Sequence, residues 1–152
     1  AQIKALTTFR GLPHRCQLVA TLNGVSYYND SKATNVGSTQ AAVEGLSGRH
    51  PNGILLLAGG LGKGQDFSPL KKYLGHEVER IYCFGKDAKL LLDLDKERCV
   101  PVADMHEGLL RAKAEARYGQ AVLLSPACAS FDQFRGFEDR GEKFVSMCDA
   151  LR

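Results

Sequence analysis

The sequence has 152 residues with a formal charge of +3, and 44% of its residues are hydrophobic. This length fits one compact domain, because single cores usually hold roughly 100–200 residues. The 24% of charged residues is close to the globular average and argues against wholesale disorder. The longest apolar run, residues 54–58, is far shorter than the roughly 20 residues of a membrane span. No basic segment followed by an apolar stretch opens the chain, so we expect no signal peptide.

The charges, cysteines and histidines argue against several function classes. The excess of 20 Lys and Arg over 17 Asp and Glu is mild and forms no run of the kind that nucleic-acid-binding domains concentrate. The five cysteines are odd in number and form no CxxC pair, which favours reduced thiols over a zinc site or a disulfide framework. The four histidines form neither an HxH nor an HExxH pair, so a metal centre has no support.

The start of the chain differs in pattern from the rest. Residues 1–10 carry apolar side chains at every third position, which predicts a short helix, and Gly11 and Pro13 are typical of its end. Such a short helix has little to pack against. We therefore assign residues 1–11 to the tail of a preceding domain or a linker, and residues 12–152 to the domain itself. The chain opens without Met, and we expect a fragment or a processed product.

Several segments are expected to be strands. The segments 16–22 and 25–28 flank Asn23 and Gly24, a dipeptide typical of a tight hairpin turn. Residues 53–58 are apolar throughout, as expected of a strand that is buried on both faces. The further predicted strands are residues 53–58, 78–84, 99–102 and 121–125.

Helices are predicted between the strands and at the end of the chain, at residues 36–46, 67–74, 87–94, 104–118 and 134–151. Asn35 and Asp104 are placed to act as N-caps. Strands that alternate with helices imply βαβ units. The sequence therefore predicts an α/β fold, with a mostly parallel sheet, helices on both faces and an antiparallel hairpin at one edge. Ligands of such sheets bind outside the carboxyl ends of the strands, so the loops that follow the strands matter most.

The first loop, residues 29–35, has the sequence Asn-Asp-Ser-Lys-Ala-Thr-Asn and lies directly before a predicted helix. Helix N-termini attract anions, and Lys32 and Thr34 could add side-chain donors. Asp30 could orient Lys32, or meet a ribose hydroxyl or a hydrated cation. The alternative is an ordinary polar turn that caps the helix.

The second loop, residues 59–67, places four glycines and Lys63 directly after a buried strand. The glycines let the backbone approach a ligand, and Lys63 is a natural donor to a phosphate or a carboxylate. The loop is not a Walker A motif, because Gly64 stands where Ser or Thr should follow the lysine. It also lacks the dinucleotide fingerprint, because Gln65 occupies the third glycine position. A tight turn without a ligand is the alternative.

The third loop, residues 125–134, has the sequence Ser-Pro-Ala-Cys-Ala-Ser-Phe-Asp-Gln-Phe. Its small residues leave room for a ligand, and Ser130 can donate a hydrogen bond. Cys128 could be a nucleophile, but no histidine is placed by the sequence to activate it, which favours a small buried thiol. Upstream of the hairpin, Arg15 could clamp a phosphate or could simply be exposed.

Taken together, these segments resemble the Mur ligase family of peptidoglycan synthesis. Residues 13–15, the first loop, residues 55–60 and residues 124–134 occur in the order that the family shows. The resemblance runs from about residue 12 to the end of the chain and implies the family's carboxy-terminal, Rossmann-like domain. Within the family, the Ser-Pro-Ala-Cys-Ala-Ser stretch and the Asp-Gln-Phe that follows are similar to the members that add D-glutamate.

The resemblance implies an ATP- and Mg²⁺-dependent ligase that adds D-glutamate to UDP-N-acetylmuramoyl-L-alanine in the bacterial cytoplasm, giving an amide, ADP and phosphate. It implies amino-terminal and central domains that hold the nucleotide sugar and most of the ATP. The chain alone is therefore expected to be inactive and to bind no cofactor tightly. We assign no catalytic residue and no metal ligand to it, and expect neither nucleic acid nor membrane as a partner.

Seven residues are implied by the resemblance as ligand contacts: Thr34, Lys63, Ser130, Phe137 and Lys32 for D-glutamate, and Arg15 and Asp30 for ATP. Thr34 and Lys63 would hold the α-carboxylate, and Ser130 with the backbone around Phe137 would hold the γ-carboxylate. Lys32 would line the same junction, and the two ATP residues would approach from across the domain cleft. A dicarboxylate needs donors at two separated points, which loops at strand exits can supply.

Two other function classes are compatible with the fold pattern. A dinucleotide-binding oxidoreductase domain would share the alternation of strands and helices, but the broken glycine fingerprint argues against it. A non-catalytic interaction domain would share the same fold, and no motif in the sequence favours it.

Overall fold

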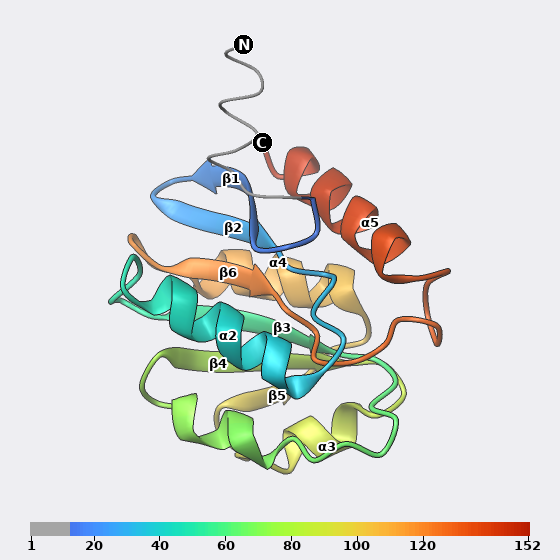
Figure 1. Ribbon diagram of the computed structural model, residues 1–152. Helices are drawn as coiled ribbons and strands as arrows, with labels where there is room; N and C mark the ends of the chain where they lie inside the picture. Colours follow the sequence, from blue (N-terminus) through green and yellow to red (C-terminus); the bar gives the residue numbers. More distant parts are fainter. Residues whose placement is uncertain (1–12) are drawn as a thin grey trace.

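The computed structural model describes residues 13–152 (Figure 1). The expectations for residues 1–11 therefore lie outside the described residues. The strands are β1 (Gln17–Leu22), β2 (Val25–Asn29), β3 (Ile54–Gly59), β4 (Val78–Phe84), β5 (Cys99–Pro101) and β6 (Ala121–Leu124). They form one sheet with the order β1-β2-β6-β3-β4-β5.

The sheet is mixed and mostly parallel. β1 runs antiparallel to β2, and every other neighbouring pair is parallel. The predicted edge hairpin and parallel sheet are thus confirmed. Both edges are irregular: β1 contains a shift in register between Leu18 and Ala20, and β5 has only three residues, of which the last is Pro101.

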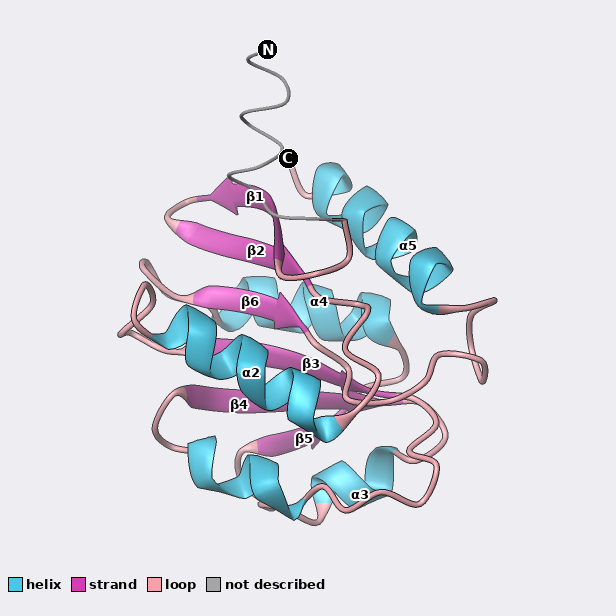
Figure 2. Cartoon of the chain, viewed as in Figure 1, coloured by secondary structure: helices cyan, strands magenta, loops and turns pink. Residues whose placement is uncertain are grey.

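Helices cover both faces of this sheet (Figure 2). The helical segments are α2 (Val36–Ser47), η1 (Ser68–Tyr73), α3 (Ala88–Leu92), α4 (Met105–Glu115) and α5 (Phe137–Ala150). α2, η1 and α3 pack on one face, and α4 and α5 pack on the other. The predicted caps are confirmed, because the Asn35 side chain accepts the N–H of Ser38 and the Asp104 side chain accepts the N–H of Glu107.

Three predicted helices need correction. The segment 67–74 contains a 3₁₀-helix rather than an α-helix, with a proline in its first turn. A six-residue segment with proline as its second residue gains few i→i+4 hydrogen bonds. α4 ends before the predicted residue 118, because the backbone of Ala116 is extended. α5 begins after the predicted residue 134, because extended Gly136 precedes its first turn.

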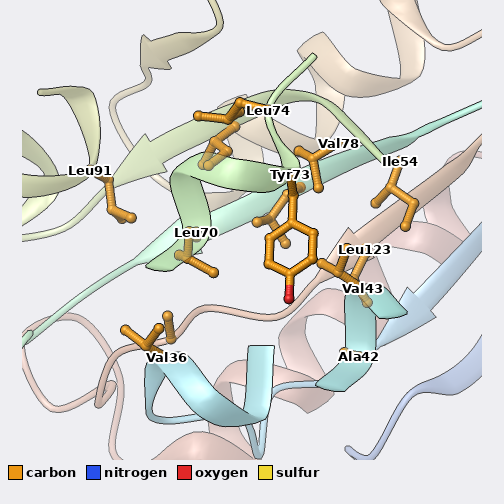
Figure 3. Packing of buried hydrophobic residues seen from close by; sticks show 14 of the residues in the cluster. Val36, Ala42, Val43, Ile54, Leu70, Tyr73, Leu74, Val78, Leu91 and Leu123 are labelled. Atoms are coloured by element: carbon orange, nitrogen blue, oxygen red, sulfur yellow. The ribbon is translucent and has the colours of Figure 1, made fainter. Parts of the chain in front are cut away.

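The core lies on both faces of the sheet, and the alternation along β3 shows how. Ile54 and Leu56 belong to the cluster under α2, η1 and α3, and Figure 3 shows side chains from α2, η1 and the strands meeting there. Leu55 and Leu57 belong to the cluster under α4 and α5. All four side chains are buried, as expected of a central parallel strand.

The topology brings the three loops to one end of the sheet. β2, β6 and β3 are adjacent and parallel, so the first, third and second loops leave the sheet side by side at their carboxyl ends (Figure 1). This is the edge at which open α/β sheets bind ligands. Within residues 13–152, no helix is long and apolar enough to cross a membrane.

Candidate ligand-binding site

A groove of about 530 Å³ follows β2 and the start of α2. Its lining residues are Arg15, Asp30, Lys32, Ala33, Thr34, Asn35, Ser38 and Ala41. Four of the sequence-predicted contacts therefore meet in one place. Arg15 and Lys32 are exposed and Thr34 is half-buried, so the groove offers two cationic side chains and a hydroxyl to an anionic ligand.

Asp30 forms the buried floor of this groove. Its Oδ2 accepts a hydrogen bond from the Ser125 hydroxyl at 2.7 Å, and its Oδ1 accepts the backbone N–H of Cys16 at 3.0 Å. Burial raises the pKa of Asp30 to about 6, although both hydrogen bonds work in the opposite direction. Since Cys16 directly follows Arg15, Asp30 fixes the backbone beside that arginine.

The Arg140 side chain of α5 connects the first and third loops through hydrogen bonds. The side chain is fully buried. Its Nε and Nη2 donate to the hydroxyl and carbonyl oxygens of Ser31 at 2.9 and 2.7 Å, and its Nη1 donates to the carbonyl of Cys128 at 3.0 Å. Burial lowers the pKa of Arg140 to about 10. No ion pair within residues 13–152 includes this guanidinium.

Phe137 and Lys32 meet where α5 begins. The Nζ of Lys32 lies 4.5 Å from the centroid of the Phe137 ring, a cation–π geometry. The carbonyl of Phe137 accepts the Ser31 hydroxyl at 2.6 Å. Its N–H lies in the first turn of α5, where backbone amides have no partner inside the helix. Phe137 thus contacts Lys32 and Ser31 of the first loop through its ring and its carbonyl, although it does not line the groove itself.

The second and third loops are paired through their backbones. Leu61 and Ala129 exchange two hydrogen bonds of 2.9 and 3.0 Å. Gly60 makes this approach possible, because its φ is +131° and a Cβ there would overlap the Ala129 carbonyl oxygen. The pairing places Ser130, which is buried, and Lys63, which is exposed, on adjacent segments. Neither residue lines the groove around Thr34.

The prediction that Cys128 is a small buried thiol is confirmed. Cys128 is fully buried, and desolvation raises the pKa of its thiol to about 12, so the nucleophilic thiolate is disfavoured. All five cysteines are free thiols. Within residues 13–152, no three or more His, Cys, Asp or Glu side chains cluster as they would to hold a metal ion.

Sequence reasoning missed several residues that shape the site. Arg140 could have been found, because it is four residues before Phe144 and eight before Cys148, and all three lie on the buried face of α5. The buried hydroxyl of Ser125 had no comparable signal. No sequence pattern pointed to Gln65 either, because its hydrogen-bond partners are backbone groups that only the folded loops bring together.

The sheet, its helical layers and the joined loops define an α/β domain of the class that binds ligands at the strand exits. Residues 14–128 match the family model described as Mur ligase, glutamate ligase domain, and the chain belongs to the Mur ligase family. The UDP-N-acetylmuramoylalanine–D-glutamate ligase of Escherichia coli O6:H1 (strain CFT073) is 49% identical to it over 152 residues, or 99% of this chain. The chain spans 34% of that relative's length.

Two solved structures share the fold at low sequence identity. The UDP-N-acetylmuramate–alanine ligase of Thermotoga maritima is 14% identical with a TM-score of 0.63, over 98% of this chain and 33% of that one. A bifunctional folylpolyglutamate synthase/dihydrofolate synthase with Mn, AMPPNP and L-glutamate bound is 17% identical with a TM-score of 0.65, over 91% and 32% of the two chains. The family assignment does not favour the alternative of an oxidoreductase domain.

Proposed function

We propose that this chain is the carboxy-terminal, amino-acid-binding domain of an ATP-dependent ligase that adds D-glutamate to UDP-N-acetylmuramoyl-L-alanine. The observation that carries the proposal is the 49% identity to a ligase named for this activity, over 99% of the chain. The reaction joins the amino group of D-glutamate to the alanine carboxyl group as an amide, while ATP yields ADP and phosphate. We place it in the bacterial cytoplasm, as a step of peptidoglycan synthesis.

In this proposal the joined loops bind D-glutamate. Thr34 and Lys63 hold the α-carboxylate, while Ser130 and the backbone N–H of Phe137 hold the γ-carboxylate. Their placement on three adjacent loops and at the start of α5 supports the assignment, because a dicarboxylate needs donors at two separated points. Ammonium, hydroxyl and helix N-terminal amide groups are all suited to carboxylate oxygens. Lys32, held against the Phe137 ring, adds positive charge at the same junction.

The ATP side of the proposal rests on Arg15 and Asp30. An exposed guanidinium at the groove suits phosphate oxygens. Asp30 acts through the Cys16 backbone, since both of its oxygens already accept hydrogen bonds. The described residues offer no set of metal ligands, so we derive no step through a metal ion on this chain. In the complete ligase, we propose that ATP is used with a divalent cation such as Mg²⁺.

The complete ligase is needed for turnover in this proposal. The chain spans 34% of the length of its relative, and we assign the nucleotide-sugar pocket and most of the ATP site to the remainder. The purified chain should therefore form no amide from D-glutamate and UDP-N-acetylmuramoyl-L-alanine. Its part is to bind the amino acid and close over ATP, and it should bind no cofactor tightly by itself.

Steady-state kinetics of the complete ligase test the residue assignments. Ser130→Ala removes a hydroxyl donor to a carboxylate and should weaken D-glutamate use by about 10–150-fold. Lys63→Ala should weaken D-glutamate use further than Ser130→Ala does, because it removes a positive charge as well as a hydrogen-bond donor. Neither change should alter the KM for ATP much. Arg15→Ala should impair ATP use more than D-glutamate use.

Lys96→Ala is the matched control, because Lys96 is an exposed lysine between α3 and β5, remote from the three loops. It should leave both KM values unchanged. The site assignments would be wrong if Ser130→Ala and Lys63→Ala behaved like this control. Absence of any D-glutamate-dependent turnover by the complete wild-type protein would instead contradict the proposed reaction.

A further inference from the structure

The Gln65 side chain contacts the start of α2, directly after the first loop, and the second and third loops. Its Oε1 accepts the backbone N–H of Val36 at 2.9 Å, and its Nε2 donates to the carbonyls of Gly62 and Ala127 at 3.0 and 2.8 Å. Val36 is the first residue of α2, Gly62 is in the second loop and Ala127 is in the third. One half-buried amide therefore joins segments that lie far apart in the sequence.

Each of these partners is close along the chain to a proposed D-glutamate contact. Val36 is two residues after Thr34, Gly62 directly precedes Lys63, and Ala127 is three residues before Ser130. A backbone shift at these partners would have to travel only one to three residues along the chain to reach the three contacts. The spacing between the two carboxylate subsites thus depends on the same hydrogen bonds.

Only a primary amide of this length meets the three demands. A planar amide combines an acceptor with two donors, whereas a carboxylate lacks the donors and an ammonium lacks the acceptor. The N–H of Val36 is one of the helix-terminal amides without an intrahelical partner. It therefore gains its hydrogen bond from Gln65, while the two carbonyls are satisfied by one NH₂ group.

We propose that Gln65 is a positioning residue, which touches no substrate and holds the three loops at the separation that a glutamate dicarboxylate requires. This inference rests on the proposed D-glutamate site. It predicts that loss of the amide lowers the affinity for D-glutamate, because misplaced donors reach one carboxylate at the expense of the other. ATP binding should be spared, because Asp30 and the backbone beside Arg15 are held by hydrogen bonds that do not include Gln65.

Gln120 provides a matched control at the opposite end of the sheet. Its Nε2 donates to the Asn52 carbonyl at 2.9 Å and to Glu79 at 3.1 Å, and its Oε1 accepts the N–H of Arg117 at 2.7 Å. Gln120→Met thus removes an equivalent set of hydrogen bonds far from the three loops. A merely structural role of either glutamine would lower the melting temperature without a selective effect on one substrate.

The experiment compares Gln65→Met and Gln120→Met in the complete ligase. Gln65→Met should raise the KM for D-glutamate roughly tenfold and change the KM for ATP less than about twofold. Gln120→Met should lower the melting temperature and leave both KM values unchanged. An unchanged KM for D-glutamate in Gln65→Met, or equal rises in both variants, would overturn the inference. Wild-type turnover in the same assay separates that failure from a failure of the proposed reaction.

A second variant keeps the test decisive if Gln65→Met folds poorly. Gln65→Glu retains the acceptor for Val36 but sets a carboxylate against the carbonyls of Gly62 and Ala127, which raises its pKa. Protonation restores one donor. The KM for D-glutamate of Gln65→Glu, relative to wild type, should therefore fall as the pH is lowered from about 8 to about 6. A ratio that does not change with pH would contradict the positioning role.

Discussion

The two ends of the sheet satisfy their polar groups in different ways. At the amino end of the parallel strands, the buried amide of Gln120 bonds to neighbouring segments, and Arg117 pairs with Glu79 at 2.9 Å. At the carboxyl end, Asp30 and Arg140 are buried, and their hydrogen bonds go to hydroxyl groups and to the backbone. At the amino end, Arg117 is thus exposed and paired with Glu79, whereas at the carboxyl end Asp30 and Arg140 are buried and take part in no salt bridge within residues 13–152.

This difference indicates what each end contributes. Burying a charge without an opposite charge is unfavourable unless hydrogen bonds offset much of the lost hydration. Folded proteins tolerate such exceptions mainly at functional sites. The carboxyl end therefore gives up stability to fix the loops that we propose bind the substrates, whereas we expect the polar contacts of Gln120 and Arg117 at the amino end to stabilise the fold.

The largest effect on stability is expected from Arg140→Met. Methionine fills much of the space but leaves the carbonyls of Ser31 and Cys128 without their donors, so the free energy of unfolding should fall by about 2–4 kcal/mol. Urea denaturation of the purified chain measures this change. A variant as stable as wild type would show that relief from the buried charge offsets the lost hydrogen bonds completely.

A smaller and pH-dependent effect is expected from Asp30→Asn. The folded-state pKa of Asp30 is about 6, above its ordinary value near 3.8, so the folded chain holds a proton that the unfolded chain releases between these pH values. This difference in proton binding lowers the free energy of unfolding progressively as the pH rises from about 4 to about 6. Above that range the contribution of Asp30 no longer changes with pH. At pH 8 the raised pKa corresponds to a loss of about 3 kcal/mol. Asparagine removes this loss but gives up one of the two acceptor oxygens, at about 1 kcal/mol, so the variant should be more stable by about 2 kcal/mol.

The measurement for Asp30→Asn is the difference in unfolding free energy between variant and wild type across this pH range. Taking the difference removes the contributions of all other titrating groups. Two curves that run parallel from about pH 4 to about pH 8 would contradict the raised pKa. In the complete ligase, the stabilised variant should still be impaired in ATP use.

The smallest effect is expected from Arg117→Met, which repeats the arginine-to-methionine exchange at the amino end. The Arg117 side chain is exposed, and its ion pair with Glu79 is open to water. Such pairs contribute roughly 0–1 kcal/mol and are weakened by salt. Denaturation at low and high salt should show a loss within this range that shrinks as salt is added. A loss as large as that of Arg140→Met would remove the contrast between the two ends.

Much of the fold follows from local patterns in the sequence. The apolar run of β3 and the Asn23-Gly24 turn predict a buried strand and an edge hairpin, and both are present. Helix ends were less predictable, because they depend on single backbone dihedral angles. Ala116 leaves α4 by adopting an extended conformation, although alanine is the best helix former.

The candidate site could be predicted only in part. Side chains that offer chemistry to a ligand, such as Thr34 and Lys32, stand out by residue type and by their place before a helix. The residues that hold the loops do not, because their partners are backbone atoms of distant segments. Gln65 and Ser125 gain their roles only when β2, β6 and β3 become neighbours.

The irregular edges of the sheet have a consequence for the domain in solution. An edge strand exposes unpaired N–H and C=O groups that can recruit a strand from another molecule. Here the register shift within β1 interrupts one edge, and at the other edge β5 is short and ends with Pro101, which has no N–H to donate. Strand addition between molecules is therefore disfavoured on both sides, which protects the domain against aggregation through its edges.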